Sequence, residues 1–186
     1  LKSIFGGNDY ETSPASLMAS FRDTLSTFAV KPSEATLAES VIADANQLAQ
    51  GLQRASAEVQ QTRKDADKQV ALDVETLNTL LVDFKKANDA VVGGTRAGRD
   101  INSELDERDR ILKKIVEIVP VDINMRDAND MALYTAGGLT LFETSPRTVT
   151  FAETGGFDAS ITGNSVFVDG QPLEVGSGAA TTSQGT

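Results

Sequence analysis

Apolar side chains recur at helical spacing through a long stretch of the chain, residues 33–92, that contains no proline and a single glycine, Gly51. Their positions step by threes and fours: Val41, Ala45, Leu48, Leu52, Ala55, Val59, and later Val70, Val74, Leu77, Leu81, Phe84 and Val91. This spacing forms one narrow seam on a helix and predicts a single helix over 34–92, roughly 90 Å long at 1.5 Å per residue. Most of such a helix must lie against other helices.

Glycine inside this helix has two interpretations. The simpler one is a tolerated glycine, which costs about 1 kcal/mol relative to alanine. The other is a functional kink at Gly51.

Two shorter helices flank the long one. Ser13 followed by Pro14 is typical of a helix start, and the apolar spacing that follows predicts a helix over 14–29. Glycines at 93, 94 and 98 predict a turn of about eight residues, and a third helix follows over 101–119. Its seam is Ile101, Leu105, Arg108, Leu112, Ile115 and Val119. Two seams on consecutive helices joined by a short turn indicate an antiparallel helical hairpin.

Capping residues predict where this third helix begins, and charged residues predict pairs on its surface. Ser103 and Asp106 fit a capping box, although Asp100 fits the cap of a slightly longer helix. Acidic residues four positions before basic ones, at 104 and 108, 106 and 110, and 109 and 113, predict weakly stabilising surface pairs.

From Pro120 onward the apolar period changes from 3.6 to 2, beginning with Val121, Ile123 and Met125. Gly137-Gly138 and Asp169-Gly170 are typical of hairpin turns. We therefore expect an α+β, mainly α fold, with a helical rod domain over 1–119 made from a long antiparallel hairpin. A small antiparallel β domain over 120–186 follows, and its glycine-rich and serine-rich end predicts a flexible tail.

Composition narrows the function classes. The chain has no Cys and no His and carries a net charge of −10, which argues against thiolate metal sites, histidine-based catalysis, nucleic acid and anionic membranes. No segment is apolar over the 18 residues that suggest a membrane span, and the first residues lack a signal-peptide core. We expect no enzyme activity, no cofactor and no metal.

Three groups of polar residues each have a structural and a functional interpretation. An oxygen-rich cluster over 122–130 lacks the glycine and final glutamate of a calcium loop, so a solvated turn is favoured over a Ca²⁺ site. Asp65 and Asp67, among basic neighbours, indicate a solvated helix face rather than paired catalytic carboxylates. Arg108 stands alone among aliphatic residues, with its head in water or, as the second interpretation, buried and paired so that it fixes the helix register.

The segment 102–112 resembles the "N-x-L-L-D-x-R-D-x-L" helix of bacterial flagellar axial proteins, and more narrowly that of hook-associated proteins of the hook–filament junction. The matching positions are Asn102, Leu105, Asp106, Arg108 and Asp109, with Ile111-Leu112 near the final leucine; Glu104 replaces a leucine. Further upstream, Ile4-Phe5, Ser16-Leu17, Phe21 and Lys31-Pro32-Ser33 are similar to the family's first helix. The resemblance covers about residues 1–145.

This resemblance implies a structural subunit that joins hook to filament, exported without a cleaved signal peptide and located outside the cell. It also implies that the chain is a central fragment without the terminal helices that drive polymerisation. The implied partners are neighbouring copies, the hook protein and the second junction protein, whereas the fragment itself is expected to be monomeric. The alternatives are a flagellin-like filament protein and a coiled-coil adaptor or binding module of a secretion apparatus.

The mechanism expected in either case is packing rather than chemistry. The side chains expected to hold the helices together are Leu48, Leu52, Leu77, Leu81, Phe84, Leu105, Arg108, Leu112 and Ile115.

Overall fold

The computed structural model describes residues 12–173 of the chain, and the fold is α+β, mainly α. The helices are α2 (Pro14–Val30), α3 (Ala35–Arg96) and α4 (Asn102–Ile118), followed by a short 3-10 turn, η2 (Asp127–Asn129). The strands are β1 (Val121–Met125), β2 (Met131–Thr135), β3 (Thr140–Phe142), β4 (Val149–Thr150), β5 (Val166–Val168) and β6 (Gln171–Leu173). The three predicted helices are confirmed, and α3 is unbroken at Gly51. The flexible tail predicted after residue 175 lies outside the described residues.

The chain divides into two compact units that meet between Asp65 and Ala66, inside α3. The strands, α4 and the second part of α3 bury their side chains in one common core. The division into domains expected at residue 119 stays a prediction. We describe the two units separately.

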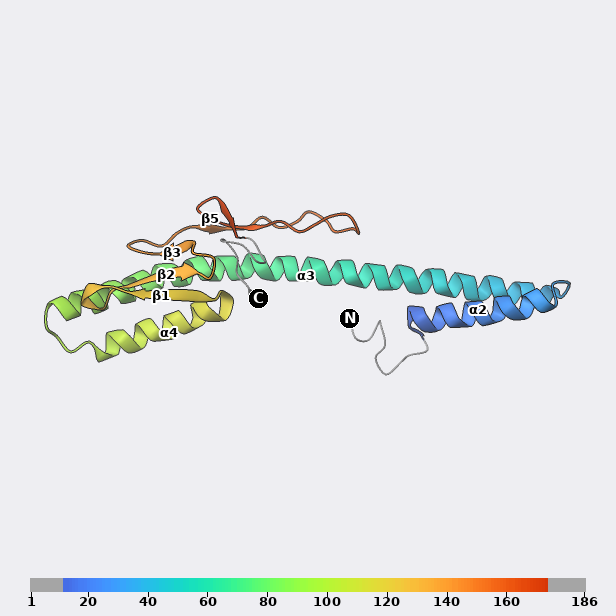
Figure 1. Cartoon of the computed structure of the whole chain (residues 1–186), viewed down its shortest axis with the longest axis horizontal. Helices are drawn as coiled ribbons and strands as arrows, with labels where there is room; N and C mark the ends of the chain where they lie inside the picture. Colours follow the sequence, from blue (N-terminus) through green and yellow to red (C-terminus); the bar gives the residue numbers. More distant parts are fainter. Residues whose placement is uncertain (1–11, 174–186) are drawn as a thin grey trace. The chain divides into compact units, whose positions relative to one another are not determined.

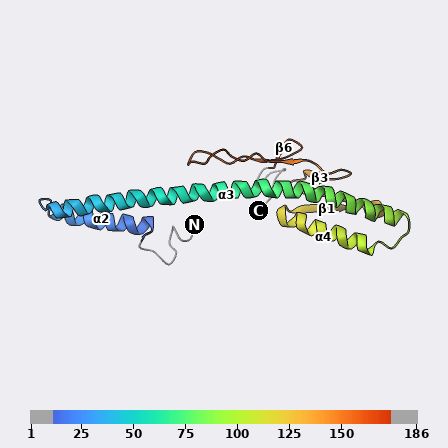
Figure 2. The same cartoon turned by 180° about the vertical axis from the view of Figure 1, so that it is seen from behind.

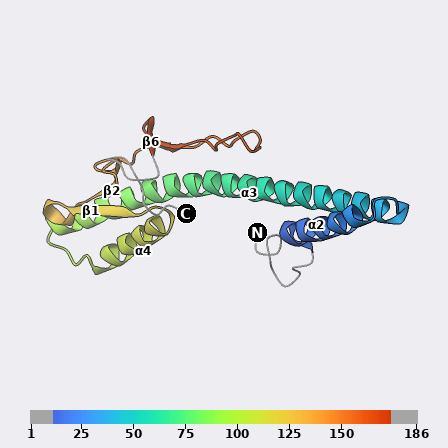
Figure 3. The same ribbon diagram turned by 45° about the vertical axis from the view of Figure 1, so that its right-hand side comes forward.

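Unit 1 is a hairpin of α2 and the first part of α3, which lie alongside each other in three views (Figures 1–3). The Ser13 hydroxyl accepts a hydrogen bond from the Ser16 amide at 3.2 Å and caps α2 as predicted. The Thr24 hydroxyl donates to the Asp44 carboxylate across the pair. A side chain at Gly51 would collide with the end of the Leu17 side chain. Gly51 is therefore a packing position where the two helices approach closely, and not only a tolerated glycine.

Unit 2 begins with the second part of α3 and α4, which runs back alongside it (Figure 1). The glycine-rich turn is shorter than expected, because α3 continues through Gly93 and Gly94 to Arg96. Gly98 ends the helix with φ at 64°. The Arg99 amide donates to the Gly94 carbonyl at 3.0 Å, and the Gly98 amide donates to the Thr95 carbonyl at 3.1 Å. These two bonds form a Schellman motif, which satisfies carbonyls that the helix end leaves open.

The start of α4 differs from the predicted capping box. The Asp100 carboxylate accepts from the amide of Asn102, the first residue of α4, at 3.1 Å. Ser103 lies inside the helix and donates to Glu104. Arg110 pairs with Glu107, three residues before it, at 2.5 Å, rather than with the predicted Asp106.

The strands form two antiparallel three-stranded sheets, in the orders β1-β2-β3 and β4-β5-β6. Val121 pairs with Thr135 and Met125 with Met131, which sets the register of the first hairpin. Both hairpin turns predicted from Gly137-Gly138 and Asp169-Gly170 are present, with φ at 83° for Gly138 and 81° for Gly170. The sheet β1-β2-β3 lies beside α3 and α4 in every view (Figures 1–3).

One hydrophobic core joins these elements in unit 2. Its buried members come from α3, from α4 and the residue after it, and from the strands: Leu77, Leu81, Phe84, Ala87, Ile111, Ile115, Val119, Met131, Leu133, Leu141, Phe142, Val149 and Val168. At its centre the rings of Phe84 and Phe142 meet edge to face, with centroids 5.2 Å apart. None of the described helices combines the length and apolarity that crossing a membrane requires.

Candidate functional site

The predicted packing residues differ widely in burial. Leu48, Leu77, Leu81, Phe84, Arg108 and Ile115 are buried, and Leu105 and Leu112 are half-buried. Leu52 is 49% exposed, because the buried stripe of α3 passes through Gly51 and Ala55 instead. On α4 the fully buried position next to Leu112 is Ile111, which the predicted seam did not include.

Arg108 is buried inside unit 2, with 2% of its surface exposed. The guanidinium is thus buried and paired, as in the second interpretation, and the expectation of a solvated head is wrong. That Arg108 fixes the helix register stays a prediction. Its Nη1 donates to the Asn88 side-chain oxygen on α3 at 3.1 Å and to the Asn129 carbonyl at 2.5 Å. Its Nε is buried without a hydrogen-bond partner among the described residues. One guanidinium thus joins α4 to α3 and to the turn between β1 and β2.

Asn88 is the second member of the network and is 2% exposed. Its oxygen accepts from Arg108 and from the Met131 amide, the latter at 3.0 Å. Its amide nitrogen donates to the Asp130 carboxylate at 2.6 Å. A single asparagine on α3 therefore holds both the start of β2 and the arginine of α4.

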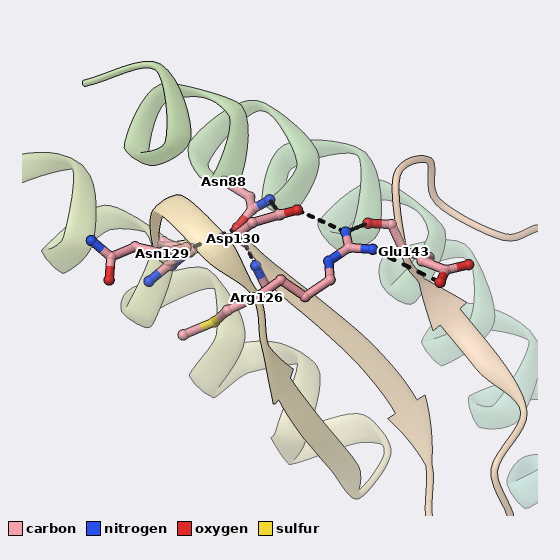
Figure 4. A network of polar contacts seen from close by, with 7 residues as sticks. Asn88, Arg126, Asn129, Asp130 and Glu143 are labelled. Atoms are coloured by element: carbon pink, nitrogen blue, oxygen red, sulfur yellow. Dashed lines mark hydrogen bonds and ion pairs between the residues drawn. The ribbon is translucent and has the colours of Figure 1, made fainter. Parts of the chain in front are cut away.

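Arg126 extends the network to β3 (Figure 4). Its guanidinium forms an ion pair with Asp130 at 2.8 Å, lies 3.8 Å from the Glu143 carboxylate, and donates to the Glu143 carbonyl. Asp130 thus receives one donor from α3 and another from Arg126. We call the set Asn88, Arg108, Arg126, Asn129, Asp130 and Glu143 the arginine network.

Two electrostatic effects act on α4. Burial lowers the pKa of the Arg108 guanidinium, while the neighbouring carboxylates of Asp109 and Asp130 raise it. Arginine remains protonated in proteins, so Arg108 is a buried cation held by neutral acceptors. On the exposed face, the hydrogen bond from Arg110 lowers the pKa of the Glu107 carboxyl.

A second buried polar contact lies at the start of unit 2. Asp67 is 8% exposed, and its carboxylate accepts from the Thr154 amide at 2.7 Å and from the Thr154 hydroxyl at 3.0 Å. The expectation that Asp67 belongs to a solvated face is wrong, because the segment between β4 and β5 folds over it. Asp65 is exposed and accepts from Gln61 at 2.8 Å, as a solvated face requires.

The arrangement has no visible catalytic use. The described residues contain no group of three or more acidic side chains placed to hold a metal ion. Within the oxygen-rich segment, Asp130 is bound to Asn88 and Arg126, and the Asn129 side chain donates to the Thr95 hydroxyl at 3.2 Å. These oxygens and donors join structural elements to each other. The candidate site is therefore a structural junction between α3, α4 and the first sheet.

Comparison with protein families matches residues 1–183 to the flagellar hook-associated protein FlgK helical domain. The chain belongs to this family. A solved structure, the flagellar hook junction protein FlgK from Burkholderia pseudomallei, is similar with a TM-score of 0.64 and 18% identity. The similarity covers 73% of this chain and 24% of that chain and shows a shared fold. The search of curated proteins found no match.

Membership of the FlgK helical-domain family confirms the resemblance seen in 102–112, which contains Arg108. Sequence reasoning identified this arginine but missed Asn88 and Arg126, and it singled out Asp130 only as part of the oxygen-rich segment expected to be a solvated turn. One signal was present, since Asn88 follows Phe84 by four and precedes Val91 by three and so interrupts the apolar seam of α3. A polar residue at a seam position is a buried hydrogen-bonding candidate. The contribution of Arg126, which comes from a turn, had no comparable signal.

Proposed function

We propose that this chain is the helical part of a structural subunit that joins the flagellar hook to the filament and acts by packing. The observation that carries the proposal is the family match over residues 1–183. Because the chain spans about a quarter (24%) of the solved relative, what the whole protein assembles with is part of the proposal. We name neighbouring copies, the hook protein and the second junction protein as the partners.

The interior of unit 2 supports a structural role. Arg108 and Asn88 use their polar groups to connect elements of the same unit. A buried arginine held in this way is suited to fixing one arrangement of helices and sheet. The proposal assigns the protein no enzymatic activity and no cofactor, and no nucleic acid or membrane as a partner.

The surface of unit 1 supports assembly. Several large apolar side chains are exposed there, namely Met18, Leu25, Val30, Ile42 and Leu52, with Val30 at 79% and Ile42 at 61%. A two-helix hairpin cannot cover both faces of its helices by itself. The proposal takes these side chains as positions where a neighbouring subunit packs against unit 1.

A groove between α3 and α4 in unit 2 supports the same conclusion. Its lining includes the apolar side chains of Leu80, Ala87 and Ile111. The rest of its lining is charged: Asp83 pairs with Lys86, Glu107 pairs with Arg110, and Lys114 lies beside them. A groove of mixed apolar and charged lining fits a neighbouring helix that presents both kinds of side chain. The subunit would act outside the cell and reach the flagellum without a cleaved signal peptide.

The experiment uses the bacterium that encodes this chain. Cells in which the gene is deleted should carry hooks with no filament attached, and the intact gene should restore filaments in electron micrographs. A gene carrying Ile42→Asp should restore fewer filaments, because a charge replaces an exposed apolar contact. Gln47→Asp, on the same exposed part of α3, is the matched control and should restore them fully.

Two results would contradict the proposal. One is normal filaments in the deletion strain. The other is a stable dimer of the chain alone at micromolar concentration in sedimentation equilibrium, because a coiled-coil adaptor should dimerise and the junction fragment is expected to remain monomeric.

A further inference from the structure

The turn between β1 and β2 has an unfavourable backbone. Ala128 has φ at 57° and Asn129 has φ at 60°, so two consecutive residues with a Cβ lie in the left-handed region. Asparagine tolerates this region, but alanine has no polar side chain to compensate for it. The β5–β6 turn meets the same demand with Asp169-Gly170, the sequence that such turns favour.

The turn makes bonds of its own. The Arg126 amide donates to the Asp130 carbonyl at 2.7 Å, the Asp130 amide donates to the Asp127 carbonyl at 3.3 Å, and Arg126 and Asp130 form an ion pair at 2.8 Å. None of these bonds involves the left-handed residues Ala128 and Asn129. A strained backbone persists only where its surroundings determine it, and the side-chain contacts made to Asn129 come from other elements.

That support comes from both helices of unit 2. From α4, Arg108 donates to the Asn129 carbonyl at 2.5 Å. From α3, Asn88 binds the Asp130 carboxylate and the Met131 amide, on the far side of the turn. Arg108 also donates to Asn88, so the two supports are joined to each other. If α4 moves away, the Asn129 carbonyl loses its bond from Arg108. Asn88, which holds the far side of the turn, loses its contact with Arg108 as well.

We propose that the β1–β2 turn is a strained catch that α3 and α4 hold closed together, so that opening of the turn and undocking of α4 are one conformational event. Arg108 is the positioning residue of this catch. A contact that displaces α4 would release the edge strand β1, and a contact that orders β1 would hold α4 in place. The catch is a property of unit 2 and does not depend on the proposed flagellar role.

A double-mutant cycle on the 186-residue chain tests the coupling, with urea unfolding as the measurement. Ala128→Gly should raise the folding equilibrium constant about tenfold, because glycine accepts positive φ without the steric penalty. In an Arg108→Met background the turn relaxes, so Ala128→Gly should change the constant by about twofold or less. An equal gain in both backgrounds, or no gain in the wild-type chain, overturns the proposal.

The control places glycine at a left-handed position of a turn that Arg108 does not touch, Asp169, with φ at 47°. Asp169→Gly removes the carboxylate that binds the Thr148 amide, so its effect should be the same with Arg108 and with Met at that position. Coupling of equal size at both turns would mean that Arg108→Met acts on the whole unit and would overturn a specific catch.

Hydrogen exchange on the unmodified chain gives a second test that does not require Arg108→Met to fold. The Met131 amide, held by Asn88, should exchange through an opening with the same urea dependence as the α4 amides near Ile115. The comparison is the Val149 amide, held at 3.0 Å by Asn78, an equivalent contact away from α4. Exchange of Met131 without urea dependence, while Ile115 stays protected, would falsify the single-event proposal.

Discussion

The two units of this molecule use the same helix, α3, in different ways. In unit 1, α3 is accompanied by α2. No residue of α2, all of which the structure describes, is fully buried. In unit 2, α3 is accompanied by α4 and two sheets, and most of the buried apolar residues of the described chain lie there. The apolar spacing of α3 is similar in both. Burial therefore depends on how many elements cover a helix, not on its apolar pattern alone.

The polar interactions differ in the same direction. In unit 1 the helices are linked by a contact of Thr24 with Asp44 and by the close approach at Gly51. In unit 2 a buried arginine and asparagine connect three elements. The polar groups of unit 2 thus connect several elements of one core, while those of unit 1 connect two helices.

Identical substitutions in the two units should show the largest difference. Leu81→Ala removes a side chain with 0% exposure and should lower the free energy of unfolding by about 3–5 kcal/mol. Leu52→Ala, on the same helix but 49% exposed, should lower it by less than about 1 kcal/mol. Urea unfolding followed by circular dichroism measures both. Equal losses would mean that Leu52 is covered in solution and that the contrast between the units is wrong.

A matched pair of asparagines on α3 tests the arginine network. Asn88→Ala leaves the Met131 amide without its side-chain acceptor and removes the Asn88 acceptor of the buried Arg108, which keeps only the Asn129 carbonyl, and should cost about 2–4 kcal/mol. Asn78→Ala removes bonds to the backbone of Val149 from a half-buried side chain and should cost about 1–2 kcal/mol. Thermal unfolding ranks the two. A smaller loss at position 88 would show that the network adds little stability.

The close approach in unit 1 should give a smaller effect. Gly51→Ala raises helix propensity by about 1 kcal/mol but forces the Leu17 side chain to move, so the net change should lie within about 1 kcal/mol. In a Leu17→Ala background the clash is absent, and Gly51→Ala should then stabilise the chain. A gain of the same size in both backgrounds would show that Leu17 does not restrict this position.

The smallest effect is expected at the exposed ion pair of α4. The folded-state pKa of Glu107 is lowered by Arg110, so the pair contributes stability above the unfolded-state pKa of about 4.3. This contribution is lost as the pH falls through the lower, folded-state value. The wild-type chain should therefore lose slightly more thermal stability between about pH 6 and pH 3 than Glu107→Gln does. If the wild-type chain and Glu107→Gln lose the same thermal stability over this pH range, the pair of Glu107 and Arg110 does not stabilise the fold.

Much of the fold was predictable from local patterns. The apolar period indicated three helices and then strands, and the Gly-Gly and Asp-Gly pairs indicated two hairpin turns, because these features depend on residues close together in the sequence. The end of α3 was placed too early, since helix propensity disfavours Gly93 and Gly94. The structure keeps them helical because Ile101 occupies the space beside Gly94 and the cap at Gly98 closes the helix.

The sequence by itself determined the helical and strand periods, the absence of Cys and His, and the motif that places Arg108 in the flagellar family. Only the tertiary structure decided that Arg108 is buried, that Asp67 is covered by Thr154, and that the units divide inside α3. Each of these depends on contacts between residues far apart along the chain, such as Asn88 with Asp130. Spacing along one element cannot show such contacts, because they depend on which other elements lie against it.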